Sequence, residues 1–237
     1  MKRFPIAIGG IVLLLMFVAS VATPIQAARI PLDEADFSNP LEIDNPYFPL
    51  EPGTSFIYQG TSEGKSTRER FTVTNRTKTI LGVETRVIRH RDWEKGKLVE
   101  DTFDWFAQDD AGNVWYFGEY STQYKNGKVI GHEGSWEAGV DGALPGIVME
   151  ASPQVDDTYQ QENAPGIAED MATVLSLDES ICVSYGCFSN VLKTKDFTPL
   201  EPDVVEHKYY APETGLIKTV LVEGGSELSE LVNIVTR

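Results

Sequence analysis

The stretch that decides the fold is residues 102–137, TFDWFAQDDAGNVWYFGEYSTQYKNGKVIGHEGSWE, which contains three of the four tryptophans. Two turn signals divide it, DAGN at 110–113 and KNGK at 125–128. Gly and Asn at such positions favour tight hairpins, and the runs between them are rich in aromatic and β-branched residues. Polar and aromatic side chains alternate along these runs, as the two-residue period of a strand requires. The stretch therefore predicts three antiparallel strands joined by two hairpins.

The same rhythm extends outward in both directions. From Thr54 to Glu137 the chain turns about every 12 to 15 residues, and no helical period lies between. Further strands are predicted at 54–59, 66–79, 83–88 and 98–108, and then at 181–194, 204–211, 216–222 and 227–236. Residues 168–175 fit either a short helix or a strand. The fold class is therefore mainly β: a single antiparallel curved sheet or half-barrel, with a closed barrel or a sandwich as alternatives.

The middle of the chain is different. Residues 138–153, AGVDGALPGIVMEASP, are rich in Gly and Pro and too irregular for a strand. Irregular segments of this length inside a compact domain are usually functional or pack as a lid. We expect residues 138–170 to cover one opening of the sheet, within a single β-rich domain at 46–237 that follows a flexible acidic leader at 28–45.

The first 27 residues have the features of a signal peptide. Lys2 and Arg3 precede an apolar run at 6–18, and Ile25-Gln26-Ala27 offers a cleavage site. The apolar run is shorter than the ~20 residues that a membrane span needs. We expect an exported protein, periplasmic or extracellular, with no stable membrane span in the mature chain; the alternative is an uncleaved N-terminal anchor.

The charge balance restricts the classes of partner. The chain has 20 Lys and Arg against 36 Asp and Glu, a net charge of −16. Removal of Lys2 and Arg3 with the signal peptide leaves 18 basic against 36 acidic residues, a net charge of −18. This surplus argues against binding nucleic acid or anionic membrane surfaces and permits cation binding.

The chain has two cysteines, Cys182 and Cys187 in CVSYGC, and in an exported protein they would meet an oxidising environment. A close, even pair predicts a disulfide. Closing so short a loop is worth only ~2 kcal/mol, so the bond would fix one hairpin. Zinc would need three or four ligands, and the sequence has no second Cys pair or H-x-x-H motif to complete such a site.

The turn at Asp109 to Asn113 is also a candidate cation site. The segment does not match a calcium loop, because with Asp109 as position 1 the ligand position 3 is Ala111, which has no side-chain oxygen. A hairpin turn in which Gly and Asn adopt positive φ is the preferred interpretation. Oxygen ligands from Asp109, Asn113 and Asp141 remain a candidate calcium site. No cofactor is firmly implied.

The aromatic side chains suggest the leading function. In a curved sheet, every second side chain of a strand points to the concave face. Burial of each large aromatic ring contributes ~2–3 kcal/mol to stability, so core packing alone would explain the aromatic residues. A concave face too wide to fill becomes a pocket for an apolar or amphipathic small molecule. We expect a non-enzymatic binding site formed by Trp105, Trp115, Phe117 and Trp136, with Glu119 and Glu137 beside them.

Paired carboxylates suggest an alternative, a secreted hydrolase acting on a carbohydrate or an ester, with or without calcium. Glu133 and Glu137 would be about 13 Å apart along a strand, too far for an acid/base pair. Glu119, Asp104 or Asp141 on neighbouring segments could approach each other more closely, as a glycosidase requires. No G-x-S-x-G elbow occurs, and the three histidines, His90, His132 and His207, are scattered. A third alternative is a structural envelope protein without a ligand.

Four motifs carry a family resemblance: DWFAQDDAGNVWYFGE at 104–119, GSWEAGVDGALPGIVM at 134–149, YQQENAPGIAED at 159–170 and KYYAPETGLIK at 208–218. They resemble a group of exported bacterial proteins, most of them uncharacterised, over roughly residues 46–218. The last motif is also similar to the final hairpin of lipoprotein-type half-barrels that carry or sense lipid. The resemblance implies secretion and one β-rich domain, and it implies no activity.

Overall fold

The computed structural model describes residues 31–236. The predicted signal peptide at 1–27 lies outside these residues, as does the start of the predicted leader. Within 31–236, no helix has the length and apolar character needed to cross a membrane. The regular structure is almost entirely strand, with one short 3₁₀ helix, η1 (Leu32–Glu34).

Fourteen strands follow η1 and form one sheet. Their bounds are β1 (Thr54–Ser62), β2 (Lys65–Ile80), β3 (Val83–Glu94), β4 (Lys97–Gln108), β5 (Val114–Lys125), β6 (Lys128–Gly131), β7 (Trp136–Glu137), β8 (Gly146–Met149), β9 (Thr158–Gln160), β10 (Met171–Val183), β11 (Gly186–Phe197), β12 (Val205–Ala211), β13 (Gly215–Glu223) and β14 (Glu227–Thr236).

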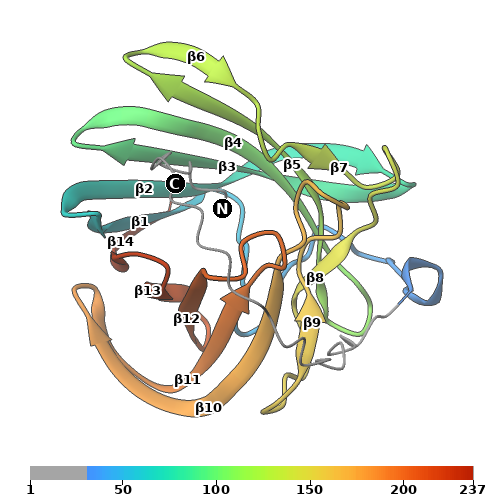
Figure 1. Cartoon of the computed structure of the whole chain (residues 1–237). Coiled ribbons are helices and arrows are strands. Elements are labelled where there is room, and N and C mark those ends of the chain that lie inside the picture. Colours follow the sequence, from blue (N-terminus) through green and yellow to red (C-terminus); the bar gives the residue numbers. More distant parts are fainter. Residues whose placement is uncertain (1–30, 237) are drawn as a thin grey trace, which may run out of the picture.

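The sheet is an antiparallel meander with one long-range closure. Its order is β6-β5-β4-β3-β2-β1-β14-β13-β12-β11-β10-β9, so the last strand pairs with the first and joins the two halves of the chain. β7 and β8 both pair with β5. Figure 1 shows the sheet bending strongly, with β2–β5 across the interior from β10–β12. The predicted single curved antiparallel sheet is confirmed, and it stays open instead of closing into a barrel.

Most predicted strands are present, but residues 181–194, predicted as one strand, are divided between the end of β10 and the start of β11. Two further segments also differ. Residues 146–149 form β8 inside the segment predicted to be too irregular for a strand, because they pair with Val114–Tyr116 of β5. The ambiguous segment 168–175 leads into a strand, β10, and not a helix. The predicted disulfide is confirmed: Cys182 and Cys187 are bonded and are register partners at the tip of the β10–β11 hairpin.

The segment predicted as a flexible leader packs against the sheet over its described part. The ring of Phe37 contacts those of Trp115 and Phe117, at 6.0 and 6.1 Å between centroids. Ile43 is buried, and the Gln108 side chain accepts the backbone N–H of Asp44 and of Asn45. Apolar contacts and backbone hydrogen bonds therefore hold a segment whose composition is polar.

Two β-bulges decide which side chains face the interior. One lies between β3 and β4 at Asp92/Trp93, and the other lies between β4 and β5 at Asp104/Phe106. At the second, Phe117 and Gly118 both oppose Trp105, and Gly118 has a φ of 128°. An extra residue reverses the alternation of a strand. The second bulge therefore brings Glu119 of β5 to the same face as Glu100 and Asp104 of β4.

Candidate ligand-binding cavity

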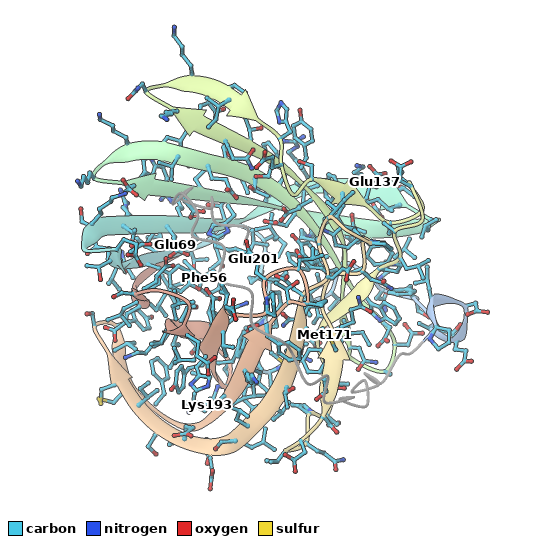
Figure 2. All side chains as sticks on the ribbon, viewed as in Figure 1. Phe56, Glu69, Glu137, Met171, Lys193 and Glu201 are labelled. Carbon is cyan, nitrogen blue, oxygen red and sulfur yellow. A yellow bond between two sulfur atoms is a disulfide. The ribbon has the colours of Figure 1, made fainter. Side chains whose placement is uncertain are left out.

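A cavity of about 170 Å³ opens on the concave face of the sheet. This is roughly ten times the space that one buried water needs, so it is large enough for a small molecule. Its walls come from β1–β5, β12 and β13, from residues 48–50, and from residues 148, 161, 162 and 170 of the predicted lid. Figure 2 places Phe56 and Glu69 toward this interior and Glu137 at the outer surface.

One part of the wall is aromatic. Phe106 stacks on Tyr116 with 4.5 Å between ring centroids, and Phe48 meets Phe106 edge-on at 5.5 Å. Phe56 and Phe71 pack edge-to-face at 6.2 Å. Such pairs fix the orientation of the rings beyond simple burial. The rings therefore form a shaped apolar surface of the kind that ligand pockets present.

Another part of the wall is acidic, and the sheet register explains the grouping. Glu69 of β2, Asp92 of β3 and Glu100 of β4 are successive cross-strand partners. Further along the same face, Asp104 of β4 is the partner of Glu119 of β5. Like charges directly opposite each other destabilise a sheet, so this arrangement has a cost that core packing does not require.

The pair Asp104 and Glu119 shares one phenol group. The Tyr116 hydroxyl lies 2.9 Å from Asp104 Oδ1 and 2.8 Å from Glu119 Oε2. One hydroxyl proton serves one acceptor at a time, so a protonated carboxyl is favoured. Burial raises the pKa of Asp104 to about 6, and burial together with Glu162 and Asp104 raises the pKa of Glu119 well above its usual value. Asp104 Oδ2 is buried without a hydrogen-bond partner.

Glu162 from the predicted lid continues this acidic group. Burial, followed by the charge of Asp170, raises its pKa to about 8. At neutral pH this part of the wall therefore contains carboxyl groups that can donate as well as accept hydrogen bonds. This part of the wall is therefore polar, although not all of its carboxyl groups are charged.

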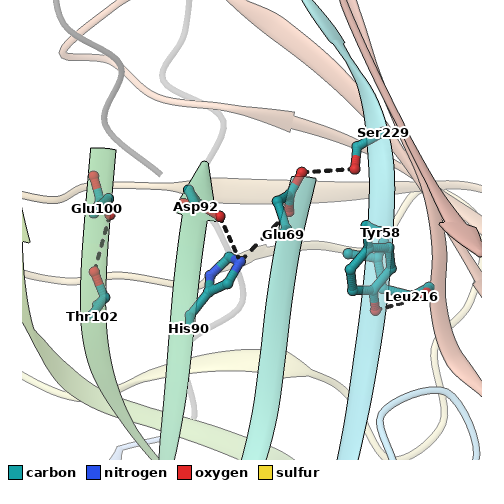
Figure 3. Close-up of polar contacts among 8 residues, drawn as sticks. All are labelled: Tyr58, Glu69, His90, Asp92, Glu100, Thr102, Leu216 and Ser229. Carbon is teal, nitrogen blue, oxygen red and sulfur yellow. Dashed lines mark hydrogen bonds and ion pairs between the residues drawn. The ribbon is translucent and has the colours of Figure 1, made fainter. Parts of the chain in front are cut away.

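Two basic side chains line the same cavity, and each contacts carboxylates. Lys208 Nζ lies 2.8 Å from Asp196 Oδ2, and the ion pair keeps the Lys208 pKa above its usual value although burial opposes it. His90 Nε2 lies 3.2 Å from Asp92 Oδ1 and 3.5 Å from Glu69 Oε2, as Figure 3 shows. Burial lowers the His90 pKa, but the two carboxylates outweigh it and raise the value well above 6.5.

The structure separates the residues predicted to bind the ligand. Glu119 lines the cavity, and Trp136 contacts the lining ring of Tyr116 edge-on at 5.5 Å. Trp105 lies between two lining residues of β4, so alternation turns its indole to the other face. Trp115 and Phe117 likewise contact Phe37 and not the cavity. The concave face is therefore lined by phenylalanine and tyrosine, and most of the predicted tryptophan wall lies outside it.

Glu137 belongs to the outer face as well. Its carboxylate accepts a hydrogen bond from Lys78 Nζ at 2.7 Å, and the same ammonium lies 3.5 Å from the centroid of the Trp105 ring. A lysine held between an indole and a carboxylate makes a cation–π contact and an ion pair together. Trp105 and Glu137 are thus neighbours, as the sequence suggested, on the surface opposite the cavity.

The candidate calcium ligands do not converge on one point. Asp109 accepts hydrogen bonds from the Asn113 backbone N–H, from Asn113 Nδ2 and from Trp115 Nε1, each at 2.8 Å. Asn113 Oδ1 accepts the Ala151 N–H at 2.9 Å. Asp141 is exposed in a different turn with a φ of 50°. The predicted hairpin turn at 110–113 is confirmed, with positive φ at Gly112 but not at Asn113. Calcium binding at these residues stays a prediction.

The sequence reasoning missed most of the cavity. Glu69, His90, Asp92, Glu100 and Glu162 were not singled out as binding residues. One sequence signal could have found them: residues two apart on a strand share a face, so Glu69 lies with Phe71, and His90 lies with Asp92. Matching these faces across strands needed the two bulges, which no turn residue reveals.

Comparisons with known proteins give two weak structural likenesses and no family. No protein-family model matches the chain, and no curated protein matches it. A crystal structure from Bacteroides fragilis, provisionally described as an exported protein with a YmcC-like fold, has a TM-score of 0.48 and 16% identity and covers 81% of this chain and 100% of that chain. A structure from Parabacteroides distasonis, provisionally described as a lipoprotein, has a TM-score of 0.43 and 12% identity and covers 81% and 99%. At these values the likeness carries no functional argument.

Proposed function

We propose that the protein is an exported, non-enzymatic binding protein for an amphipathic small molecule, held in the cavity on the concave face of the sheet. The observation that carries the proposal is the division of the cavity wall into an aromatic part and a carboxyl-rich part. An apolar ligand alone would leave the buried oxygen Asp104 Oδ2 without a hydrogen-bond partner, which costs free energy. A fully polar ligand would leave the rings of Phe56, Phe71 and Phe106 facing water.

The polar groups of the cavity wall indicate which chemical groups the polar end of the ligand would carry. Asp104, Glu119 and Glu162 offer carboxyl oxygens close to the stacked rings of Phe106 and Tyr116. Asp104 Oδ2 is a buried acceptor without a hydrogen-bond donor. A polar end with hydrogen-bond donors, such as hydroxyl or amine groups, would satisfy it. The apolar end would lie against Phe56, Phe71 and Leu216.

A fluorescent probe and a blocking substitution test this function. N-phenyl-1-naphthylamine, a neutral apolar dye, should bind the purified protein with increased emission and be displaced by amphipathic molecules recovered from it by native mass spectrometry. Val148→Trp places an indole at the cavity wall and should abolish dye binding, whereas Val222→Trp, at an exposed position of β13, should not. Equal dye binding by both variants would contradict the proposal.

The Asp104–Tyr116–Glu119 group supports a second candidate function, a hydrolase. Two carboxyl groups bridged by one phenol, with pKa values raised by burial, resemble the acid and base pairs of glycosidases. Turnover of nitrophenyl glycosides or esters that is lost in both Asp104→Asn and Glu119→Gln would favour this candidate over a carrier. Dye binding without turnover would favour the carrier.

A further inference from the structure

Glu69, His90 and Asp92 form a compact side-chain cluster that neither candidate function uses. His90 and Asp92 lie two residues apart on β3 and so share one face, and Glu69 on β2 is the cross-strand partner of Asp92. One ligand atom from each residue lies within 4.8 Å of the other two. All three side chains are mostly buried, with 13–20% of each exposed. Figure 3 shows them converging at the ring nitrogen of His90.

The spacing fits a tetrahedral metal ion. Ligand atoms about 2.0–2.2 Å from zinc are separated from one another by roughly 3.3 Å in a tetrahedron. His90 Nε2 lies 3.2 Å from Asp92 Oδ1 and 3.5 Å from Glu69 Oε2. His90 Nε2 and Asp92 Oδ1 are both buried from solvent, and neither makes a hydrogen bond of regular geometry. An imidazolium in ion pairs with the two carboxylates and a metal ion bound by all three groups both account for this proximity.

The surroundings orient the cluster. The Ser229 hydroxyl donates to Glu69 Oε1 at 2.7 Å, which leaves the other oxygen, Oε2, on the His90 side. Outer-shell hydrogen bonds of this kind fix metal ligands in place. Asp92 is also the cross-strand partner of Glu100, so three carboxylates of neighbouring strands lie side by side. A divalent cation here would offset the repulsion among these carboxylates.

We propose that Glu69 Oε2, His90 Nε2 and Asp92 Oδ1 bind a divalent transition-metal ion, with zinc as the best fit. A nitrogen ligand disfavours calcium and magnesium, which prefer oxygen-only sites. Glu69 and His90 line the cavity, so a fourth coordination position on that side is open to water or to a bound molecule. Zinc binding to the imidazolium form releases one proton, because the metal takes the ring nitrogen that carries it. The site does not depend on the proposed carrier function.

Titration calorimetry with zinc chloride on chelator-treated, dialysed protein tests the site. We expect one zinc ion per chain, and at least a 100-fold weaker affinity in His90→Gln, since even outer-shell changes cost 10- to 100-fold. His207→Gln is the matched control: His207 lies on β12 next to the cavity-lining Lys208, so its ring points to the other face. Zinc uptake equal in His90→Gln and wild type, or no uptake by wild type, overturns the proposal.

Further variants keep the test decisive if His90→Gln does not fold. Glu69→Gln and Asp92→Asn should each lose the site, and Ser229→Ala should weaken it about tenfold by releasing Glu69. Cobalt added to wild type should give the visible absorption of a tetrahedral site, and excess calcium should not displace it. Normal affinity in both Glu69→Gln and Asp92→Asn would show that zinc binds to other surface acids and would overturn the proposal.

Discussion

At the residue scale, the turn at Asp109 could be predicted from the sequence, but the hydrogen bonds of its side chain could not. The D-x-x-G-N-x-W pattern predicted a hairpin turn, and the structure has one. The pattern did not reveal that the Asp109 carboxylate is nearly buried and accepts three hydrogen bonds, including one from the indole of Trp115. Sequence identifies the turn because Gly and Asn limit the backbone, whereas the indole contact depends on how β5 leaves the turn.

Replacing Asp109 therefore tests the structural role of this turn. Asp109→Ala leaves three donors of Asn113 and Trp115 buried without an acceptor, at about 1–3 kcal/mol each. We expect the free energy of unfolding to fall by about 3 kcal/mol or more, measured by urea denaturation. Asp110→Ala, at the exposed neighbouring position, should cause a much smaller loss. Similar losses in the two variants would show that the Asp109 hydrogen bonds contribute little.

At the scale of elements, hairpins were predictable and bulges were not. Turns at 95–96 and 126–127 follow from Lys-Gly and Asn-Gly pairs that adopt positive φ. The register that such a turn sets holds only as far as the next bulge. Beyond Asp92/Trp93 and Asp104/Phe106 the register moves by one residue, which reverses the inward and outward faces. On β4 itself the prediction chose the wrong parity, because residues 100, 102, 104 and 106 line the cavity and Trp105 faces away from it.

Gly118 is the residue on which the second bulge depends. Its φ of 128° disfavours any side chain, and an added Cβ would overlap the backbone of Trp136 and Glu137. Gly118→Ala should lower the melting temperature by several degrees, since about 1–3 kcal/mol of strain corresponds to roughly 2–4 °C per kcal/mol. Gly127→Ala is the control with a φ of 73° and open space around the Cβ, and its loss should be smaller. Equal losses would show that strain, and not the close approach of β7, dominates.

At the scale of the whole molecule, the curved sheet was predictable, whereas most of the residues that line its cavity were not. Turn spacing and alternation predicted one antiparallel sheet, because these signals are local. The cavity joins side chains that are far apart in the chain, such as Phe56, Asp104, Glu162 and Lys208. Their meeting depends on the pairing of β14 with β1 and on the lid segment returning to the concave face. The Gly- and Pro-rich composition indicated a lid at 138–170, but no single-sequence signal shows which of its side chains enter the cavity or that β14 pairs with β1.

The buried acids predict how the stability of the whole protein depends on pH. Between the usual glutamate pKa of 4.5 and the value of about 8 for Glu162, the folded protein holds a proton that the unfolded chain has lost. The free energy of unfolding must then fall as pH rises, by up to about 1.4 kcal/mol per pH unit for each such proton. Asp104 acts in the same direction between pH 3.8 and about 6. His90, whose pKa is raised, adds stability that is complete below pH 6.5 and is lost at higher pH.

We therefore expect urea denaturation in the presence of a chelator to show a continuous loss of stability from pH 5 to pH 8. Glu162→Gln cannot ionise at this position, so its free energy of unfolding should fall less between pH 5 and pH 8 than that of wild type. Glu84→Gln, at an exposed position of β3, should leave the slope unchanged. Stability that rises over this range, or a slope unaffected by Glu162→Gln, would mean that the acids of the concave face are ionised and held by cations. In that case the cavity would have to contain bound positive charge even in the free protein.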